Sequence, residues 1–214
     1  MIIPVGGRLS LSLLEKQIVF HHLNNGGILA FPTDTLYGLG VKPGLSRAVD
    51  QLYTVKKRDK TKPLILLGAS IEQFQPYTTK PQLLQHPLLS TYWPGPLTVV
   101  LPFERSSDLY FGQDDPQSIG MRIPNHMLLL DLLSFLDFPL LTTSANPSES
   151  IPLRDGQSIQ DWLLSASSSE CVVLDSGEME NLPSTVIQLL ETGQIEFIRE
   201  GVLLKENLSS FSQT

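Results

Sequence analysis

The sequence predicts one α/β domain, with an open, twisted, mixed β-sheet and helices packed on it. Helical patterns alternate along the chain with short, almost purely apolar runs, which are typical of strands buried on both faces. The 214 residues suffice for one substantial core, and neither an internal repeat nor a dividing linker is present. A hairpin pattern near the C-terminus adds antiparallel strands, so the sheet is expected to be mixed.

The first elements are a helix, a strand and a second helix. Residues 11–25 have a helical pattern in which Ser12 and Glu15 show the spacing of a capping box, and a run of Asn and Gly ends it. Residues 28–32 follow as a buried strand. Ser46 is expected to cap the second helix, which ends in a lysine-rich segment.

The rest of the chain continues the alternation of strands and helices. We expect a strand at 64–67, and then a helix that carries Leu83, Leu84, Leu88 and Leu89 and is closed by a turn at 93–96. Strands at 97–103 and 118–124 follow, then a helix at 125–136 capped by Asn125 and a strand at 139–146 that runs into a loop. The last elements are a helix opened by Ser158 and Asp161, a strand at 171–175, a hairpin over 184–200 turning at 192–193, and a frayed tail.

Composition and charge exclude several classes of protein. Apolar residues at 41% with 17% charged residues are typical of a globular chain. A net charge of −7 argues against a protein whose main affinity is for the nucleic-acid backbone, because that binding needs a broad basic face. No apolar run approaches the roughly 18–20 residues that span a bilayer, and no signal peptide is recognisable. The single cysteine, Cys171, excludes an intramolecular disulfide, so a cytoplasmic protein is expected.

Three polar segments stand at the ends of predicted strands or helices, where open α/β sheets bind ligands. They are "FPTDTLYGLG" (31–40), "KKRDKTK" (56–62, called the basic segment below) and "TTSAN" (142–146). Each also has an ordinary structural interpretation: a tight turn, a solvated charged face, and a Ser/Asn-stabilised turn. Hydroxyl groups and backbone amides of the third segment could instead cradle a phosphate.

Several common sites are excluded at the level of motifs. No G-x-x-x-x-G-K-[ST] loop occurs, and Ser144 lacks the G-x-S-x-G context of a serine hydrolase. The four histidines have no metal-ligand spacing, and Cys171 lies in an apolar strand pattern that favours a core position over a nucleophile. We therefore predict no dedicated metal site.

Seven segments taken in order resemble the YrdC-like family of threonylcarbamoyl-AMP synthases. They are "GGILAFPTDTLYGLG", "KKRDKTKPLILL", "WPGPLTVVL", "IGMRIPNH", "PLLTTSANPS", "PSTVIQL" and "FIREGVL". The similarity covers about residues 10–203. It implies a single domain of the YrdC-like fold over residues 1–214, with residues 204–214 as a tail and a basic concave cavity on the sheet.

The resemblance implies a reaction that joins L-threonine, bicarbonate (or CO₂) and ATP into L-threonylcarbamoyladenylate and releases pyrophosphate. Mg²⁺ would enter with ATP, and no prosthetic group is implied. A separate protein system transfers the product to adenosine 37 of tRNA, so at most weak tRNA binding, and no membrane, is expected of this chain.

The resemblance also assigns site residues by position. Threonine is expected against Thr33, Arg122, Thr142 and Ser184, with the planar fork of Arg122 holding the carboxylate. The ATP-contacting positions are Lys56, Arg58, Ser118, Ser144, Asn146, Pro152 and Arg199. No residue is assigned a chemical step, because catalysis would rest on positioning and charge neutralisation. Lys57 is expected to face water, and Lys60 and Lys62 receive no contact.

This chain departs from the family in two respects, and two other functions are alternatives to the one that the resemblance implies. Longer relatives have a histidine where this chain has Leu67, and they carry a further C-terminal domain. One alternative function is a non-catalytic RNA- or nucleotide-binding protein. The other is a carbamoyl-transfer module like those within hydrogenase-maturation carbamoyltransferases, although this sequence lacks their zinc-finger and acylphosphatase-like segments.

Overall fold

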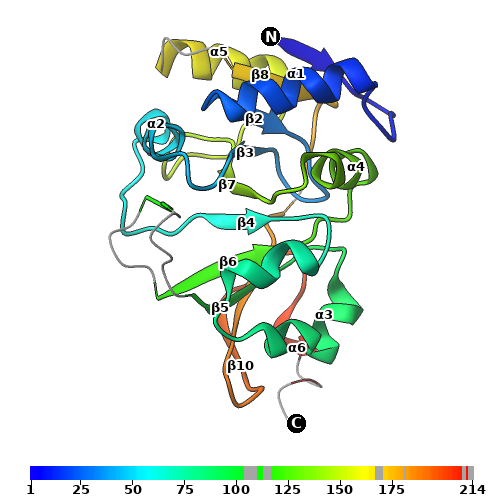
Figure 1. Cartoon of the computed structure of the whole chain (residues 1–214), viewed down its shortest axis with the longest axis vertical. Helices are drawn as coiled ribbons and strands as arrows, with labels where there is room; N and C mark the ends of the chain where they lie inside the picture. Colours follow the sequence, from blue (N-terminus) through cyan, green and yellow to red (C-terminus); the bar gives the residue numbers. More distant parts are fainter. Residues whose placement is uncertain (104–109, 113–116, 167–170, 181, 209–210, 212–214) are drawn as a thin grey trace.

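A ten-stranded mixed sheet forms the centre of the computed structural model, which describes residues 1–103, 110–112, 117–166, 171–180, 182–208 and 211. The strands lie in the order β1 (Ile2–Pro4), β8 (Cys171–Asp175), β2 (Ile28–Phe31), β3 (Gly38–Val41), β7 (Leu140–Ser144), β4 (Ile65–Leu67), β6 (Ser118–Arg122), β5 (Leu97–Pro102), β9 (Thr185–Leu189) and β10 (Ile195–Arg199). Strands β1 and β10 lie at opposite ends of the sheet (Figure 1).

Parallel and antiparallel pairs alternate irregularly across the sheet, which confirms the predicted mixed architecture. Strand β8 pairs in parallel with β1 and β2, β4 with β6, and β5 with β9. The other pairs are antiparallel, including the predicted hairpin of β9 and β10. Within that hairpin, Gly193 donates its backbone N–H to Leu190 O, so the turn lies where the sequence placed it.

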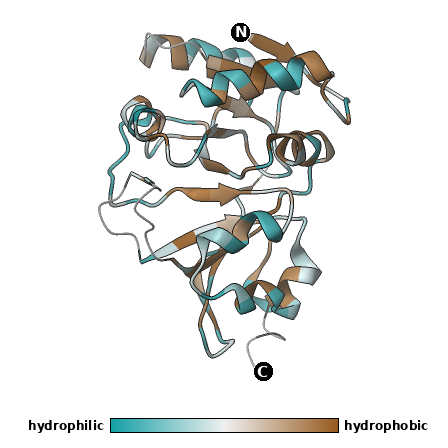
Figure 2. Ribbon diagram, viewed as in Figure 1, coloured by the Kyte–Doolittle hydropathy of each residue, from teal (hydrophilic) through white to brown (hydrophobic). Residues whose placement is uncertain are grey.

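Helices cover both faces of the sheet, and two apolar clusters fill the space between them. Helices α1 (Leu13–Asn24) and α4 (Met127–Leu136) pack on one face, where Phe31 and Leu140 are buried. Helices α2 (Ser46–Lys56) and α5 (Gly156–Ala166) pack on the other, over Leu39 and Val173. Figure 2 shows the hydrophobic colour on the central strands and on much of α4, and the polar colour on loops and on parts of the other helices. Among the described residues, no helix combines the length and apolar character needed to cross a bilayer.

Helix caps agree with the sequence in one case and differ in three. Ser12 and Glu15 form the predicted capping box of α1. The Ser46 cap is wrong: Leu45 caps α2 through its backbone carbonyl, which accepts from the N–H groups of residues 48 and 49, so Ser46 is already helical.

The caps of α4 and α5 each lie elsewhere than predicted. His126, not Asn125, caps α4, because its Nδ1 accepts the N–H of Leu129. Helix α5 starts before Ser158 and Asp161, since Asp155 Oδ1 accepts the Ser158 N–H at 2.8 Å and Gly156 is already helical.

Other elements were missed or misassigned. The predicted helix around Leu84 and Leu88 is divided into the 3₁₀ helix Pro81–Gln85 and the short helix α3 (Pro87–Tyr92), since Pro87 lacks a backbone N–H. A further 3₁₀ helix, Glu72–Tyr77, was not predicted. Strands β1 and β3 were not predicted. Part of the tail expected to be frayed is helix α6 (Lys205–Leu208), whose Leu208 is fully buried.

Glycines explain why β3 was missed and why it forms. Glycine is a poor strand residue, and "GLGV" contains two. A Cβ added at either Gly38 or Gly40 would lie 2.8 Å from the ring of Phe31. The aromatic ring therefore lies against bare backbone of β3, and this close approach requires glycine.

Candidate functional site

The register of four strands places several predicted site residues on one face of the sheet. Directly paired residues project their side chains to the same face. Ile65 of β4 pairs with both Thr142 of β7 and Gly120 of β6. Ser118 and Arg122 flank Gly120 at a spacing of two, as Ser144 flanks Thr142, so all four polar side chains share this face.

Gly120 lets two neighbouring side chains pack closely on this face. A Cβ there would lie 2.8 Å from Cγ2 of Ile65 and 3.3 Å from Cγ2 of Thr98. These two side chains therefore cover the backbone of β6 between Ser118 and Arg122. The basic concave cavity predicted here stays a prediction.

Arg122 lies at the end of β6 and is the most strongly held cation of this face. It is 4% exposed, and its Nε donates to Gly95 O at 3.0 Å. Nη1 donates to Thr35 Oγ1 at 2.8 Å, and Nη2 forms a 2.5 Å ion pair with Asp34 Oδ1. Burial lowers the pKa of Arg122, Asp34 opposes that effect, and the nearby charge of Arg199 adds to it. Two distant segments thus meet at this guanidinium.

The segment after β2 is both a tight turn and part of the site. Thr33 Oγ1 donates to Leu36 O at 2.7 Å and accepts the backbone N–H of Thr35 at 3.0 Å. This closed turn presents Asp34 and Thr35 to Arg122. The two interpretations of "FPTDTLYGLG" are therefore compatible. Asp34 and Thr35 were not assigned from the sequence, although their place directly after a buried strand was a signal for them.

Ser184 and Arg199 lie on the side of the site formed by β5 and β9. The Ser184 hydroxyl lies 2.9 Å from Thr98 Oγ1, and Arg199 Nη2 donates to Ser184 O at 2.9 Å. The charge of Arg199 also lowers the pKa of Arg122, so these predicted residues lie close to one another.

Lys56 reaches the loop after β7 but does not present a free ammonium group. It is 1% exposed, and its Nζ donates to Ser144 O at 2.5 Å, Asn146 O at 2.6 Å and Asn146 Oδ1 at 3.2 Å. Burial, with the neighbouring charge of Arg58, lowers its pKa from 10.5 to about 7. An ammonium has three N–H groups, so all of them are directed at protein oxygens. Direct contact with phosphate would require Lys56 to exchange one of these partners.

The loop after β7 is held together by its own backbone. Ala145 donates its N–H to Tyr37 O at 2.8 Å, and Asn146 donates to Ser144 O at 3.1 Å. The Ser144 hydroxyl donates to Asn146 Oδ1 at 2.6 Å. These two amides are not available to cradle a phosphate, whereas Ser144 and Asn146 do lie together as predicted.

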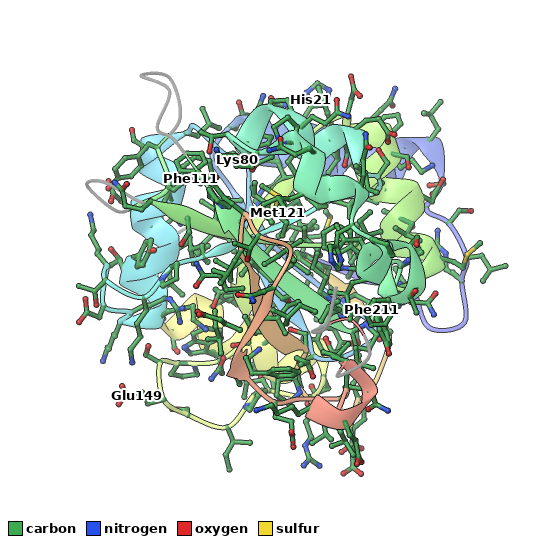
Figure 3. All side chains as sticks on the ribbon, turned by 90° about the horizontal axis from the view of Figure 1, so that it is seen from below. His21, Lys80, Phe111, Met121, Glu149 and Phe211 are labelled. Atoms are coloured by element: carbon green, nitrogen blue, oxygen red, sulfur yellow. The ribbon has the colours of Figure 1, made fainter. Side chains whose placement is uncertain are left out.

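The basic segment divides into residues with different roles. Lys57 is exposed, as expected, and ends α2 with a left-handed φ of 51°. Arg58 is half-buried and donates through Nε to Lys62 O and through Nη2 to Pro63 O, while its Nη1 donates to none of the described residues. Lys60 pairs with Asp50, and Lys62 pairs with Glu149 at the outer edge of the molecule (Figure 3). Arg58 is therefore the member of the segment best placed to meet an anion.

The other assigned positions are more loosely connected to these groups. Thr142 Oγ1 donates to Ile65 O at 3.2 Å. Pro152 lines a pocket of about 290 Å³ together with Leu36 and Tyr37, beside the turn after β2. Leu67 is buried and pairs with Arg122, so the place of the relatives' histidine is an apolar neighbour of the guanidinium. Cys171 is buried in β8, where burial raises the pKa of its thiol.

Among the described residues there is no cluster of three or more His, Cys, Asp or Glu side chains that could hold a metal ion. Asp34 is the acidic side chain that contacts Arg122, and one of its oxygens is already engaged.

Comparison with known proteins gives consistent results. The family model Sua5_yciO_yrdC, described as "Telomere recombination", matches residues 21–201. The threonylcarbamoyl-AMP synthase of Vibrio vulnificus is 36% identical over 150 residues, which is 69% of this chain and 80% of that protein. The enzyme of the same name from Aliivibrio fischeri is 34% identical over 183 residues, 84% of this chain and 95% of that protein.

Solved structures share the fold. P. abyssi Sua5 complexed with L-threonine has a TM-score of 0.86 and 29% identity, and the match covers 100% of this chain and 61% of that one. The chain therefore spans about three fifths of the length of that archaeal protein. E. coli YciO has a TM-score of 0.77 at 22% identity, covering 94% of this chain and 95% of its own.

Proposed function

The chain belongs to the Sua5/YciO/YrdC family, and on that basis we propose that it is a threonylcarbamoyl-AMP synthase. Its substrates would be L-threonine, bicarbonate or CO₂, and ATP with Mg²⁺, and its products L-threonylcarbamoyladenylate and pyrophosphate. The adenylate would supply a separate protein system that modifies adenosine 37 of tRNA. The whole chain would act as a single domain.

The observation that carries this proposal is the environment of Arg122. A guanidinium matches a carboxylate with two parallel hydrogen bonds, and a nearly dry site strengthens them. Arg122 is buried at the sheet face that also bears Thr142 and Ser144, and Ser184 and Arg199 lie close to it. An amino-acid carboxylate bound there would leave its amine directed along the same polar face.

The reaction would proceed by two bond-forming steps. The ammonium group of threonine first loses a proton to water. The resulting amine nitrogen attacks CO₂, which bicarbonate supplies by taking up a proton and losing water, and it loses a second proton to water, giving a carbamate. A carbamate oxygen then attacks the α-phosphorus of ATP, and the bond to the β-phosphate oxygen breaks as magnesium pyrophosphate leaves. The nucleophile is already an anion, so the residues mainly have to position it and neutralise charge.

Two cations would supply that neutralisation. Arg58 keeps N–H groups that donate to none of the described residues, and Arg199 is held by Ser184 through only one of its nitrogens. Lys56 would act mostly by fixing the loop that carries Ser144 and Asn146.

Pyrophosphate release provides the test. With ATP and Mg²⁺ present, release should require both threonine and bicarbonate, and omission of either should abolish it. Arg122→Lys keeps the charge beside Asp34 but loses the planar fork, so the threonine KM should rise about tenfold or more. The control Arg8→Lys changes an arginine in an exposed ion pair and should leave that KM unchanged. Release that needs neither threonine nor bicarbonate would contradict the proposal, and strong, salt-dependent RNA binding without release would favour the non-catalytic alternative.

A further inference from the structure

Asp34 is a half-buried carboxylate in the candidate threonine site to which the proposed reaction gives no role. Its side chain is 13% exposed, and its Oδ1 accepts the 2.5 Å hydrogen bond from Arg122 Nη2. Its Oδ2 accepts no hydrogen bond from any described residue. A carboxylate offers about four acceptor sites, so the described residues use only a small part of its capacity.

Arg122 also keeps unused hydrogen-bonding capacity. Of its five N–H groups, three donate to Gly95, Thr35 and Asp34. The remaining two, which donate to none of the described residues, are divided between Nη1 and Nη2, since each of these nitrogens carries two N–H groups and uses one for these contacts. Arg122 can therefore bind a substrate carboxylate without releasing Asp34.

The pair as a whole is electrically neutral but strongly dipolar. A lone buried arginine would attract any carboxylate. An aspartate beside the arginine repels a simple anion, so the attraction of the pair for that anion is weaker. An α-amino acid carries its own opposite charges on adjacent atoms, with one carbon between the carboxylate and the ammonium group. Its charge distribution is the complement of Arg122 and Asp34, and burial amplifies both interactions.

We propose that Asp34 Oδ2 receives the α-ammonium group of the amino-acid substrate whose carboxylate binds Arg122. This inference rests on the proposed function. Asp34 is then a substrate-binding residue that selects α-amino acids over other small carboxylates and fixes the nitrogen that becomes carboxylated. No proton transfer is assigned to it.

The role can be separated from a purely structural one by removing the amine from the ligand. L-Threonine and (R)-3-hydroxybutyrate share the carboxylate and the hydroxyl, but only threonine has an amine. We would measure the binding of both by NMR titration, which resolves weak affinities, to the wild type and to Asp34→Asn. Asp131→Asn is the matched control, since Asp131 forms a 2.7 Å ion pair with Lys16 away from this site.

The expected result is a loss confined to the amine. In Asp34→Asn, threonine should bind about 10- to 100-fold more weakly, as for a lost hydrogen bond to a charged group, while 3-hydroxybutyrate should change little or bind better. Asp131→Asn should leave both affinities unchanged. Thermal unfolding of each variant verifies that it is folded.

Other outcomes overturn the inference. Equal weakening of both ligands would mean that Asp34 only orients Arg122, and unchanged threonine affinity would remove Asp34 from the site. If the wild type turned over threonine but Asp34→Asn kept its preference for the amine, the inference alone would fail. If the wild type did not bind threonine, the proposed function would fail with it.

Discussion

Lys56 belongs to a charged motif, but its contacts in the structure differ from those that the sequence predicted. The sequence placed it against phosphate, but its ammonium donates to two backbone carbonyls and one amide oxygen of the loop after β7. Nothing in the spacing of the basic segment indicates this, because the acceptors lie 88 and 90 residues away along the chain. The sequence assigned Ser144 and Asn146, the neighbours of Lys56, to the same site. It did not indicate which of these residues would contact a ligand.

The lowered pKa of Lys56 predicts a pH-dependent stability. Its pKa falls from 10.5 to about 7 on folding, so between those values the unfolded chain binds more protons than the native state. The free energy of unfolding of the wild type, relative to Lys56→Met, should therefore rise with pH from about 7 to 9, by at most about 1.4 kcal/mol per pH unit. Urea unfolding at several pH values measures it. A constant difference would mean that the three oxygens keep the ammonium charged.

Arg58 and Lys57 are neighbours with opposite predicted importance. Arg58 is half-buried and has N–H groups that donate to none of the described residues, whereas Lys57 is exposed. Arg58→Ala should raise the ATP KM or lower kcat by an amount corresponding to about 2–5 kcal/mol, the scale for a cation removed from a desolvated charge pair. Lys57→Ala should behave like the wild type. Steady-state kinetics on both variants would contradict this assignment if they responded alike.

Elements with strong local signals could be predicted, and those that depend on tertiary contacts could not. The capping box of α1 and the apolar run of β2 were recognisable because each is local. Strand β3 was not, since it depends on Phe31 packing against its glycines and on pairing with β7 more than 100 residues later. Likewise, α6 is held by burial of Leu208, which no local pattern indicates.

The packing of β3 leads to a prediction for Gly40. A Cβ there would lie 2.8 Å from the Phe31 ring and 3.3 Å from Leu140, so Gly40→Ala must displace one of them. We expect the free energy of unfolding to fall by about 1–3 kcal/mol, the usual cost of overpacking. At Gly6 the nearest atom would be an ordinary 3.5 Å away, so Gly6→Ala serves as the control in the same denaturation experiment. Equal stability of the two variants would show that the ring moves at no cost.

At the scale of the whole molecule, the site is a product of topology. Arg122 ends β6, Asp34 follows β2 and Arg199 ends β10. These three segments come together although β2 and β10 lie toward opposite ends of the sheet. The chain is acidic overall, with a charge of −7, yet Arg199 lies near enough to Arg122 for its charge to lower the pKa of that guanidinium. The sequence supplied the residues through their resemblance to a family, while strand order and register, which depend on long-range pairing, supplied the face that they share.

In the proposed reaction, threonine, bicarbonate and ATP are joined into one molecule at this face. Mass spectrometry of a reaction containing ATP, Mg²⁺, threonine and ¹³C-bicarbonate tests this directly. We expect threonylcarbamoyladenylate that carries the ¹³C label and disappears when threonine is omitted. An adenylate without the label, or no threonine-dependent adenylate at all, would contradict it.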